Sequence, residues 1–211
     1  MERKIFVLSL HRTGTQSVHD LFLRLGMRAI RWPKIVDGVD YQSRIIGREN
    51  DPAFIADVLA PVFARATALS DVPIPALYRV LDARFKGAQF IAVRRNASDW
   101  IRSVRRHIGQ RPFNPFEKAQ YFPYLAAPPD RITSVPDDDL MEMHRRHYEA
   151  LAKFFVLRMN YALFELNDPR LGPRICEFLG RPPMDLRHVD TTRRGRNAES
   201  NQNSPRNLGD H

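Results

Sequence analysis

Residues 4–17 read KIFVLSLHRTGTQS, which predicts a buried strand, a tight turn and the start of a helix. The apolar run 5–10 is too short to cross a membrane and suits a central strand of a parallel sheet. Gly14 lets the backbone turn its N–H groups toward a ligand, and a helix N-terminus favours an anion there. The stretch therefore predicts an anion-binding loop. Its candidate ligand-binding residues are Arg12, Thr13, Gly14, Thr15, Gln16 and Ser17.

This loop lacks the pattern of the common nucleotide hydrolases. That pattern is Gly, four residues, then Gly-Lys-[Ser/Thr], so that a lysine reaches the terminal phosphates and a hydroxyl binds magnesium. Here Arg12 precedes the glycine instead. A glycine and hydroxyls in a strand–turn–helix unit can equally be structural, so the loop alone leaves both interpretations open.

A second strand–turn–helix unit follows at residues 87–103, GAQFIAVRRNASDWIRS. Arg95 follows the predicted strand at its carboxyl end, where a fork-shaped guanidinium suits charge-assisted binding of phosphate. With a helix starting near Asn96, Ser103 lies about 10 Å along its axis, within the range that a long arginine side chain can bridge. The alternative is a solvated basic face. That face would consist of Arg94, Arg95, Arg102, Arg105 and Arg106.

Taken together, the two units resemble the sulfotransferase family. Residues 12–15, Arg-Thr-Gly-Thr, resemble its 5′-phosphosulfate loop, although Arg12 stands where Lys is more usual. Its 3′-phosphate motif is matched position by position by Arg95, Asn96, Asp99 and Ser103. The resemblance implies 3′-phosphoadenosine 5′-phosphosulfate (PAPS) as sulfuryl donor, with Arg95 and Ser103 binding one phosphate and no metal required.

The resemblance also suggests a catalytic base. Asp71 follows a predicted strand and precedes Val72-Pro73, a place where one branch of the family has Asp-x-Pro and others have His. A carboxylate at the carboxyl end of a parallel strand lies at the ligand-binding edge of such sheets, although Asp71 can equally be a turn residue. His11 and His107 are the other candidate bases. The expected catalytic residues are Asp71, Arg12 and His11.

From Asp185 onward apolar residues become rare, which predicts a loop or disordered basic tail. Within it, Arg193-Arg194-Gly195 resembles the Arg-Lys-Gly loop with which the family closes over the donor's 3′-phosphate. A basic tripeptide in a tail can instead be merely solvated.

Strand and helix signals alternate along the rest of the chain, as in an open parallel sheet covered on both faces. We expect an α/β fold of three layers, α/β/α, with a central parallel sheet of about four to five strands, similar to P-loop NTPases. Residues 1–184 would form the sulfotransferase-like domain and 185–211 the tail. Predicted strands cover 5–10, 27–32, 66–70, 89–93 and 161–165; predicted helices cover 18–25, 51–65, 76–85, 96–108, 137–159 and 170–179.

Two irregular segments remain, and both are placed on the acceptor side. Residues 38–50 are polar, and the proline-rich residues 108–136 are expected to form a lid or a linker. Aromatic residues in such loops can line a pocket or pack against their own domain. The candidates for an acceptor pocket are Tyr41, Arg44, Phe113, Phe116, Tyr121 and Tyr124.

Composition limits the remaining choices. The 211-residue chain carries a formal net charge of +9, which indicates anionic ligands without identifying them. Its single cysteine, Cys176, lies in an apolar helical pattern and is expected to pack in the core. No apolar stretch approaches the roughly 20 residues of a membrane span, so a soluble cytoplasmic enzyme is the default.

Several functions stay open at this point. We expect a sulfotransferase that moves a sulfuryl group from PAPS to a hydroxyl or amine of a small-molecule or carbohydrate acceptor. A P-loop kinase or NTPase would share the fold but lacks Gly-Lys-[Ser/Thr]. A nucleic-acid-binding protein would share the charge, but no recognition motif supports it and no nucleic-acid partner is expected. A catalytically inactive donor-binding protein is a further alternative. The oligomeric state is not predicted.

Overall fold

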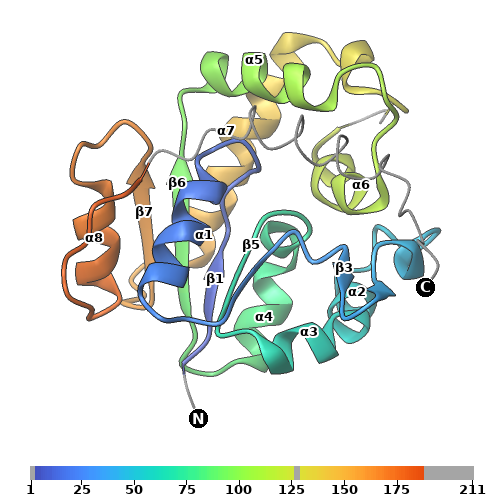
Figure 1. Cartoon of the computed structure of the whole chain (residues 1–211). Coiled ribbons are helices and arrows are strands. Elements are labelled where there is room, and N and C mark those ends of the chain that lie inside the picture. Colours follow the sequence, from blue (N-terminus) through green and yellow to red (C-terminus); the bar gives the residue numbers. More distant parts are fainter. Residues whose placement is uncertain (1–2, 126–128, 188–211) are drawn as a thin grey trace, which may run out of the picture.

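The structure is a computed structural model and describes residues 3–125 and 129–187. Its centre is a five-stranded sheet in the order β2-β5-β1-β6-β7, and every neighbouring pair is parallel (Figure 1). The strands are β1 (Ile5–Val7), β2 (Ala29–Arg31), β5 (Ala68–Ser70), β6 (Gln89–Arg94) and β7 (Tyr161–Glu165). The predicted parallel sheet of four to five strands is therefore confirmed.

Helices cover both faces of the sheet, because side chains of successive strand residues point to opposite sides. Phe6 and Phe90 belong to one hydrophobic cluster, and Val7 and Ile91 belong to the other. The first cluster includes residues of α2 (Pro52–Val58), α3 (Ala60–Arg65), α4 (Tyr78–Arg84), α5 (Ala97–Ile108), α6 (Pro115–Tyr121) and α7 (Asp137–Phe154). The second includes residues of α1 (Thr15–Arg24) and α8 (Leu171–Phe178). The result is the predicted three-layer α/β/α architecture.

The strand order brings three strand ends to one place. β1 lies between β5 and β6, so the loops after these three strands are neighbours at the carboxyl edge of the sheet. The chain leaves β1 toward β2 and β5 and later returns to β6 on the other side of β1. Such a topological switch point is where open α/β sheets bind ligands.

Helix α7 fixes the ends of two of these strands with side chains from one helical face. His147 Nε2 lies 2.8 Å from the Leu8 carbonyl oxygen, and His144 Nε2 lies 2.9 Å from that of Arg95. The Tyr148 hydroxyl donates to the Val93 carbonyl at 2.9 Å. These bonds hold the backbone just before and after the two loops, which makes the carboxyl edge of the sheet rigid.

Several element boundaries differ from the sequence predictions. The helix predicted over 51–65 is two helices that meet at Leu59, because Pro61 lies at the start of α3 and has no N–H for a continuous helix. Asp51 caps α2 as its sequence suggested, accepting from Phe54 N at 2.9 Å. The helix predicted over 137–159 ends at Phe154, and Leu157 beyond it has a positive φ.

The two segments expected to be irregular contain regular structure. The first holds part of the small hairpin of β3 (Ile35–Val36) and β4 (Val39–Asp40), followed by the 3₁₀ turn η1 (Ser43–Ile45). The second holds α6 and the turns η3 (Phe122–Tyr124) and η4 (Ile132–Ser134). Phe116 and Ile132 are fully buried in the main core, so this segment is a packed wall of the domain.

Two smaller expectations concern Cys176 and the membrane. Cys176 is a fully buried free cysteine in the cluster around α8, as predicted. Among the residues that the structure describes, no helix has the length and apolar character needed to span a bilayer.

Candidate active site

The loop between β1 and α1 is tied down through its carbonyl groups. Thr13 Oγ1 donates to the Leu10 carbonyl at 2.6 Å, Trp100 Nε1 to that of His11 at 3.0 Å, and Arg95 Nη1 to that of Arg12 at 3.3 Å. The first amides of a helix have no partner within the helix. The loop thus points its carbonyls into the protein and begins α1 with N–H groups available to a ligand.

Gly14 is required at the start of α1 for two reasons. Its φ is 83°, in the left-handed region that other residues enter at a cost. A Cβ at this position would lie 2.6 Å from Leu166 Cδ1. Leu166 follows β7, so the loop after β1 passes close to the end of a strand that lies two places along the sheet.

Arg12, Arg95 and Ser103 lie together, whereas the sequence paired only Arg95 with Ser103. Arg12 Nε donates to Ser103 Oγ at 3.3 Å, while Arg95 Nη1 donates to the Arg12 carbonyl. Arg12 thus joins the two in a three-residue cluster, and the binding of one phosphate by Arg95 and Ser103 stays a prediction. The reason is tertiary: β1 and β6 are neighbours, so the loop arginine reaches the α5 helix directly.

A cavity of about 360 Å³ lies over this cluster. It is lined by loop residues, by Arg95 after β6 and by Asp71 after β5, so all three central strand ends contribute. The predicted residues that line it are His11, Arg12, Gly14, Thr15, Gln16, Ser17, Asp71, Arg95 and His107. Thr13, predicted with them, is instead buried with its hydroxyl on the Leu10 carbonyl.

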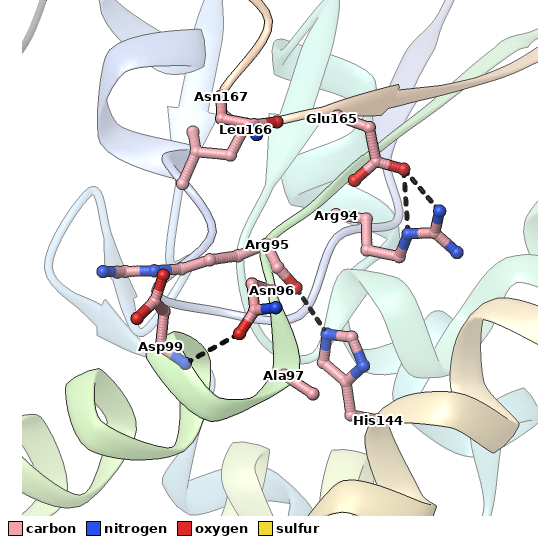
Figure 2. Close-up of a pocket in the computed structure, with 9 residues that line it drawn as sticks. All are labelled: Arg94, Arg95, Asn96, Ala97, Asp99, His144, Glu165, Leu166 and Asn167. Atoms are coloured by element: carbon pink, nitrogen blue, oxygen red, sulfur yellow. Dashed lines mark hydrogen bonds and ion pairs between the residues drawn. The ribbon is translucent and has the colours of Figure 1, made fainter.

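A larger cavity of about 680 Å³ adjoins the first and shares Arg95 and Leu166 with it. Figure 2 shows Arg95 extending along this space from the end of β6, with Asn96 and Asp99 below it at the start of α5. Arg94 points the other way and pairs with Glu165, and His144 is bonded to the Arg95 carbonyl (Figure 2). Arg95 therefore forms part of the wall of both cavities.

Electrostatics favour an anion in the loop cavity. Burial lowers the pKa of the Arg12 guanidinium, Asp71 opposes that shift, and repulsion from Arg95, Arg31 and Arg106 adds to it. The clustered cations destabilise one another in the folded protein. An anion bound among them would remove that repulsion, which is a physical reason to expect one here.

Two basic residues of α5, Arg102 and Arg105, are neutralised by carboxylates. Arg102 pairs with Asp99, and Arg105 pairs with Asp137 and donates to the Ile132 carbonyl at 2.7 Å. The solvated basic face considered from the sequence is therefore mostly a set of ion pairs. Arg95 differs from these residues because it lies in both cavities.

Asp71 is held rigidly at the edge of the loop cavity. It is 6% exposed and has a φ of 71°. Its Oδ2 accepts from Arg31 Nη1 at 2.9 Å, and its Oδ1 accepts from Val72 N at 2.9 Å. A non-glycine residue in this backbone conformation carries strain, and such strain is typical of functional sites.

His11 and His107 lie between the loop and a further cavity. His11 Nε2 lies 2.5 Å from the Tyr121 hydroxyl, and its ring centroid is 5.8 Å from that of His107. Burial lowers the pKa of His11. Loss of hydration, together with His11 and Arg12 nearby, lowers the pKa of His107 to about 4. Both imidazoles are therefore neutral at physiological pH.

The further cavity, which we call the acceptor-side cavity, measures about 370 Å³. It shares His11, Arg31, Asp71 and His107 with the loop cavity. Its other lining residues are Trp32, Lys34, Gln42, Val72, Arg111, Asn114 and Glu117. Sequence reasoning missed most of these. Arg31 and Trp32 lie at the carboxyl end of a predicted strand. Gln42, Arg111, Asn114 and Glu117 lie in the two segments that the sequence placed on the acceptor side, although none of them was named individually.

The residues proposed from the sequence for an acceptor pocket do not line this cavity. Phe116 and Tyr121 are fully buried, and Tyr124 bonds His147 at 3.2 Å through its hydroxyl. The aromatic members of the set pack against their own domain, which was the alternative, whereas Arg44 is exposed and lies over the Tyr41 ring. The whole set concerned is Tyr41, Arg44, Phe113, Phe116, Tyr121 and Tyr124.

The described end of the chain passes over the loop cavity. Leu186 lines that cavity, and Arg24 Nη2 donates to the Asp185 carbonyl at 2.8 Å. Gly172 of α8 lies against the same segment, since a Cβ on it would be 2.4 Å from Leu186 N. Arg193, Arg194 and Gly195 lie outside the described residues.

Within residues 3–125 and 129–187, no group of three or more His, Cys, Asp or Glu side chains is arranged to hold a metal ion.

Comparison with known proteins gives a family and a fold. A family model described as "Sulfotransferase domain" matches residues 4–192. A shikimate kinase from Bacteroides thetaiotaomicron has a TM-score of 0.52 at 14% identity, covering 84% of this chain and 98% of its own. That similarity shows the fold alone. No curated protein matches the chain.

Two solved sulfotransferases are also similar, with lower TM-scores. One, from Alicyclobacillus acidocaldarius, has a TM-score of 0.48 at 14% identity, covering 95% of this chain and 91% of its own. The other, a sulfotransferase domain from the curacin biosynthetic pathway, has a TM-score of 0.46 at 15% identity. The match covers 87% of this chain and 76% of that domain. The family assignment itself depends on the match that spans most of the sequence, from the strand before the anion-binding loop to beyond α8: the chain belongs to the sulfotransferase domain family.

Proposed function

We propose that this protein transfers a sulfuryl group from PAPS to a hydroxyl or amine of a small-molecule or carbohydrate acceptor. The observation that carries the proposal is the loop cavity, where Arg12, Arg95 and Asp71 meet from three adjacent strand ends. The donor supplies the sulfuryl group and leaves as adenosine 3′,5′-bisphosphate when the acceptor's oxygen or nitrogen attacks sulfur in line. Family membership supports the reaction class.

Each chain segment has a role in this proposal. The α1 amides and Arg12 bind the 5′-phosphosulfate and stabilise the charge that develops on the leaving phosphate. Arg95, with Ser103 behind Arg12, binds the 3′-phosphate, and the larger cavity beside Arg95 receives the nucleoside. The clustered cations and the left-handed Gly14 fit such a donor.

On the acceptor side of the transferred sulfuryl group, Asp71 accepts the proton of the attacking hydroxyl or amine. Arg31 and the Val72 amide hold its carboxylate at the boundary of the loop and acceptor-side cavities. His11 and His107, both neutral, line the same boundary, and we place His11 beside the transferred group. No metal is needed in this scheme, because fixed cations and a helix N-terminus supply the positive charge.

The basic tail completes the donor site in this proposal. Leu186 already lines the loop cavity, and seven further residues span up to about 25 Å when extended. Arg193, Arg194 and Gly195 are therefore within reach of the donor's 3′-phosphate. Removing residues 190–211 would weaken donor-product binding if they close over it.

Ligand-induced thermal stabilisation tests the donor. We expect adenosine 3′,5′-bisphosphate to raise the melting temperature in the presence of a chelator; at 100 times Kd the gain in stability is about 2.7 kcal/mol. ATP with magnesium and a short oligonucleotide serve as comparisons. Stabilisation by ATP only with magnesium would favour a kinase, and stabilisation by the oligonucleotide alone would favour a nucleic-acid-binding protein.

Asp71→Asn tests the base. The variant keeps the size of the side chain but cannot take a proton, so turnover should fall about 10²- to 10⁴-fold, measured as bisphosphate release. Binding of adenosine 3′,5′-bisphosphate should stay within about twofold, since Asp71 does not contact the donor phosphates in this scheme. Asp57→Asn, which alters another Arg-paired aspartate far along the chain, is the control. Parallel loss of turnover and donor binding would assign Asp71 a structural role.

A further inference from the structure

The acceptor-side cavity has a charge balance that is informative about its ligand. Arg31 pairs with Asp71 at 2.9 Å, and Arg111 makes two bonds of 2.7 Å to Glu117. These four charges cancel in pairs. Lys34 is the remaining cation of the cavity and forms no ion pair in the described part of the chain. It acts on the carboxylate of Asp40, whose pKa is lowered mainly by hydrogen bonds from Ser43 and to a smaller extent by Lys34. The Lys34 ammonium group lies 5.8 Å from the Trp32 ring centroid.

Gln42 provides a second polar signal in the same cavity. The residue is 9% exposed, and within the described chain its Oε1 is buried without a hydrogen-bond partner. A buried amide oxygen left in this state costs about 1–3 kcal/mol. An acceptor atom in such a position favours a ligand that carries a hydrogen-bond donor, such as a hydroxyl group.

Trp32 provides a flat apolar surface at this cavity. Its side chain is 42% exposed although large apolar residues are normally buried, and its φ is 48°. The backbone bond from Trp32 N to the Ser70 carbonyl, 3.1 Å long, holds it next to Asp71. The exposed Trp32 indole, held by a strained backbone beside Asp71, can therefore pack against one face of a ligand's ring.

We propose that the acceptor is a hydroxylated ring that carries an anionic group, as an acidic or phosphorylated sugar does. Lys34 binds the anionic group, Gln42 Oε1 accepts a hydrogen bond from a ring hydroxyl, and Trp32 covers one face of the ring. A second hydroxyl then points to Asp71. This inference rests on the proposed function and adds the chemical class of its acceptor.

Binding measurements with matched ligands test the class without requiring turnover. The probes are methyl β-glucuronide, glucose 6-phosphate and the neutral methyl β-glucoside, titrated calorimetrically with and without saturating adenosine 3′,5′-bisphosphate. We expect a carboxylate or a phosphate to improve affinity about tenfold or more over the neutral sugar, as for other charge-assisted hydrogen bonds. The two anionic probes distinguish which group Lys34 prefers.

Variants test whether the preference for anionic over neutral sugars comes from Lys34. Lys34→Met should abolish it, Lys34→Arg should keep it, and Lys153→Met, which removes an exposed lysine at the end of α7, should leave it unchanged. Gln42→Met should weaken all bound sugars about threefold to tenfold, since it removes a hydroxyl partner. Circular dichroism checks that each variant is folded.

Three results would overturn the inference: equal affinity for the neutral and anionic sugars, a preference that survives in Lys34→Met, or no binding by any probe. These results leave the donor assay untouched. If adenosine 3′,5′-bisphosphate stabilises the protein but the sugars do not discriminate, only the acceptor class is wrong. If the bisphosphate fails to bind, the proposed function fails, and the titrations without it still decide the acceptor class.

Discussion

At the residue scale, backbone strain marks the site. Three residues that line the cavities have positive φ without being glycine: Arg12 at 67°, Trp32 at 48° and Asp71 at 71°. Each such conformation costs on the order of 1–3 kcal/mol and persists only where surrounding contacts enforce it. The bonds to the Arg12 carbonyl, to Trp32 N and to the Asp71 carboxylate are those contacts.

The buried bond between His11 and Tyr121 gives a prediction at this scale. Burial raises the pKa of the Tyr121 phenol well above its usual value, so the hydroxyl stays protonated and fixes the His11 ring. Tyr121→Phe should lower the free energy of unfolding by about 1–3 kcal/mol, because a buried imidazole nitrogen loses its partner. Denaturant unfolding measures this change.

Tyr121→Phe should also slow turnover, because it moves the His11 side chain at the boundary of the loop and acceptor-side cavities. Tyr124→Phe is the matched control, since it breaks a comparable bond to His147 outside the acceptor-side cavity. It should reduce stability without altering turnover. If the two variants slow turnover equally, Tyr121 does not position His11 for function.

Some residues of the candidate site could be predicted from the sequence, and others could not. Arg12 and Arg95 were identified in two strand–turn–helix units, and Asp71 was identified through the resemblance of Asp71-Val72-Pro73 to the family's Asp-x-Pro. All three follow predicted strands, and parallel strands bring their carboxyl ends together. Lys34 and Gln42 carried no such signal. Their positions depend on how the β3–β4 hairpin folds back against the sheet, which no local pattern encodes.

At the element scale, the helix periodicity predicted which segments are helical better than where they end. Amphipathic spacing identified α5 and α7, whose buried residues repeat every three to four positions. The break at Leu59 follows from Pro61, which the sequence shows, whereas the early end of α7 depends on backbone and tertiary details. The wall formed by α6 was missed because its prolines suggested a loop, whereas Pro115 starts the helix.

The contact of α8 with the chain's last described segment gives a prediction at this scale. A Cβ at Gly172 would lie 2.4 Å from Leu186 N and 2.5 Å from the Met184 carbonyl oxygen, so backbone must move. Gly172→Ala should displace Leu186 from the loop cavity and weaken adenosine 3′,5′-bisphosphate binding about threefold to tenfold, as measured by calorimetry.

Stability should change little in this variant, because alanine is favoured over glycine in a helix by about 1 kcal/mol, which offsets part of the clash. Glu177→Ala, an exposed change on the same helix, should have no effect on binding. Unchanged affinity in Gly172→Ala would mean that the segment does not contribute to the donor site.

At the scale of the whole molecule, buried histidines link stability to pH. His147 is fully buried, and burial lowers its pKa to about 4. Between pH 6.5 and about 4 the unfolded chain binds a proton there that the folded chain does not. The free energy of unfolding is therefore fully retained above pH 6.5 and falls as the pH drops through this window.

The expected loss from this residue is about 2–3 kcal/mol at pH 4, by the free energy equivalent of a pKa shift. His147→Gln keeps a donor for the Leu8 carbonyl but cannot titrate. Urea unfolding at pH 7.5 and pH 5 should show a smaller pH effect in the variant than in the wild type. Identical pH effects would show that His147 does not account for the acid sensitivity.

The course of the chain has a practical consequence. β1 begins at the amino edge of the sheet (Figure 1). Residues that follow the carboxyl ends of β1, β5 and β6 line the cavities at the opposite edge, and Leu186 lies in the wall of the loop cavity. A purification handle or a tether to a sensor chip belongs at the amino terminus. A bulky partner joined close to Leu186 would instead stand beside the loop cavity and would disturb the affinities measured there.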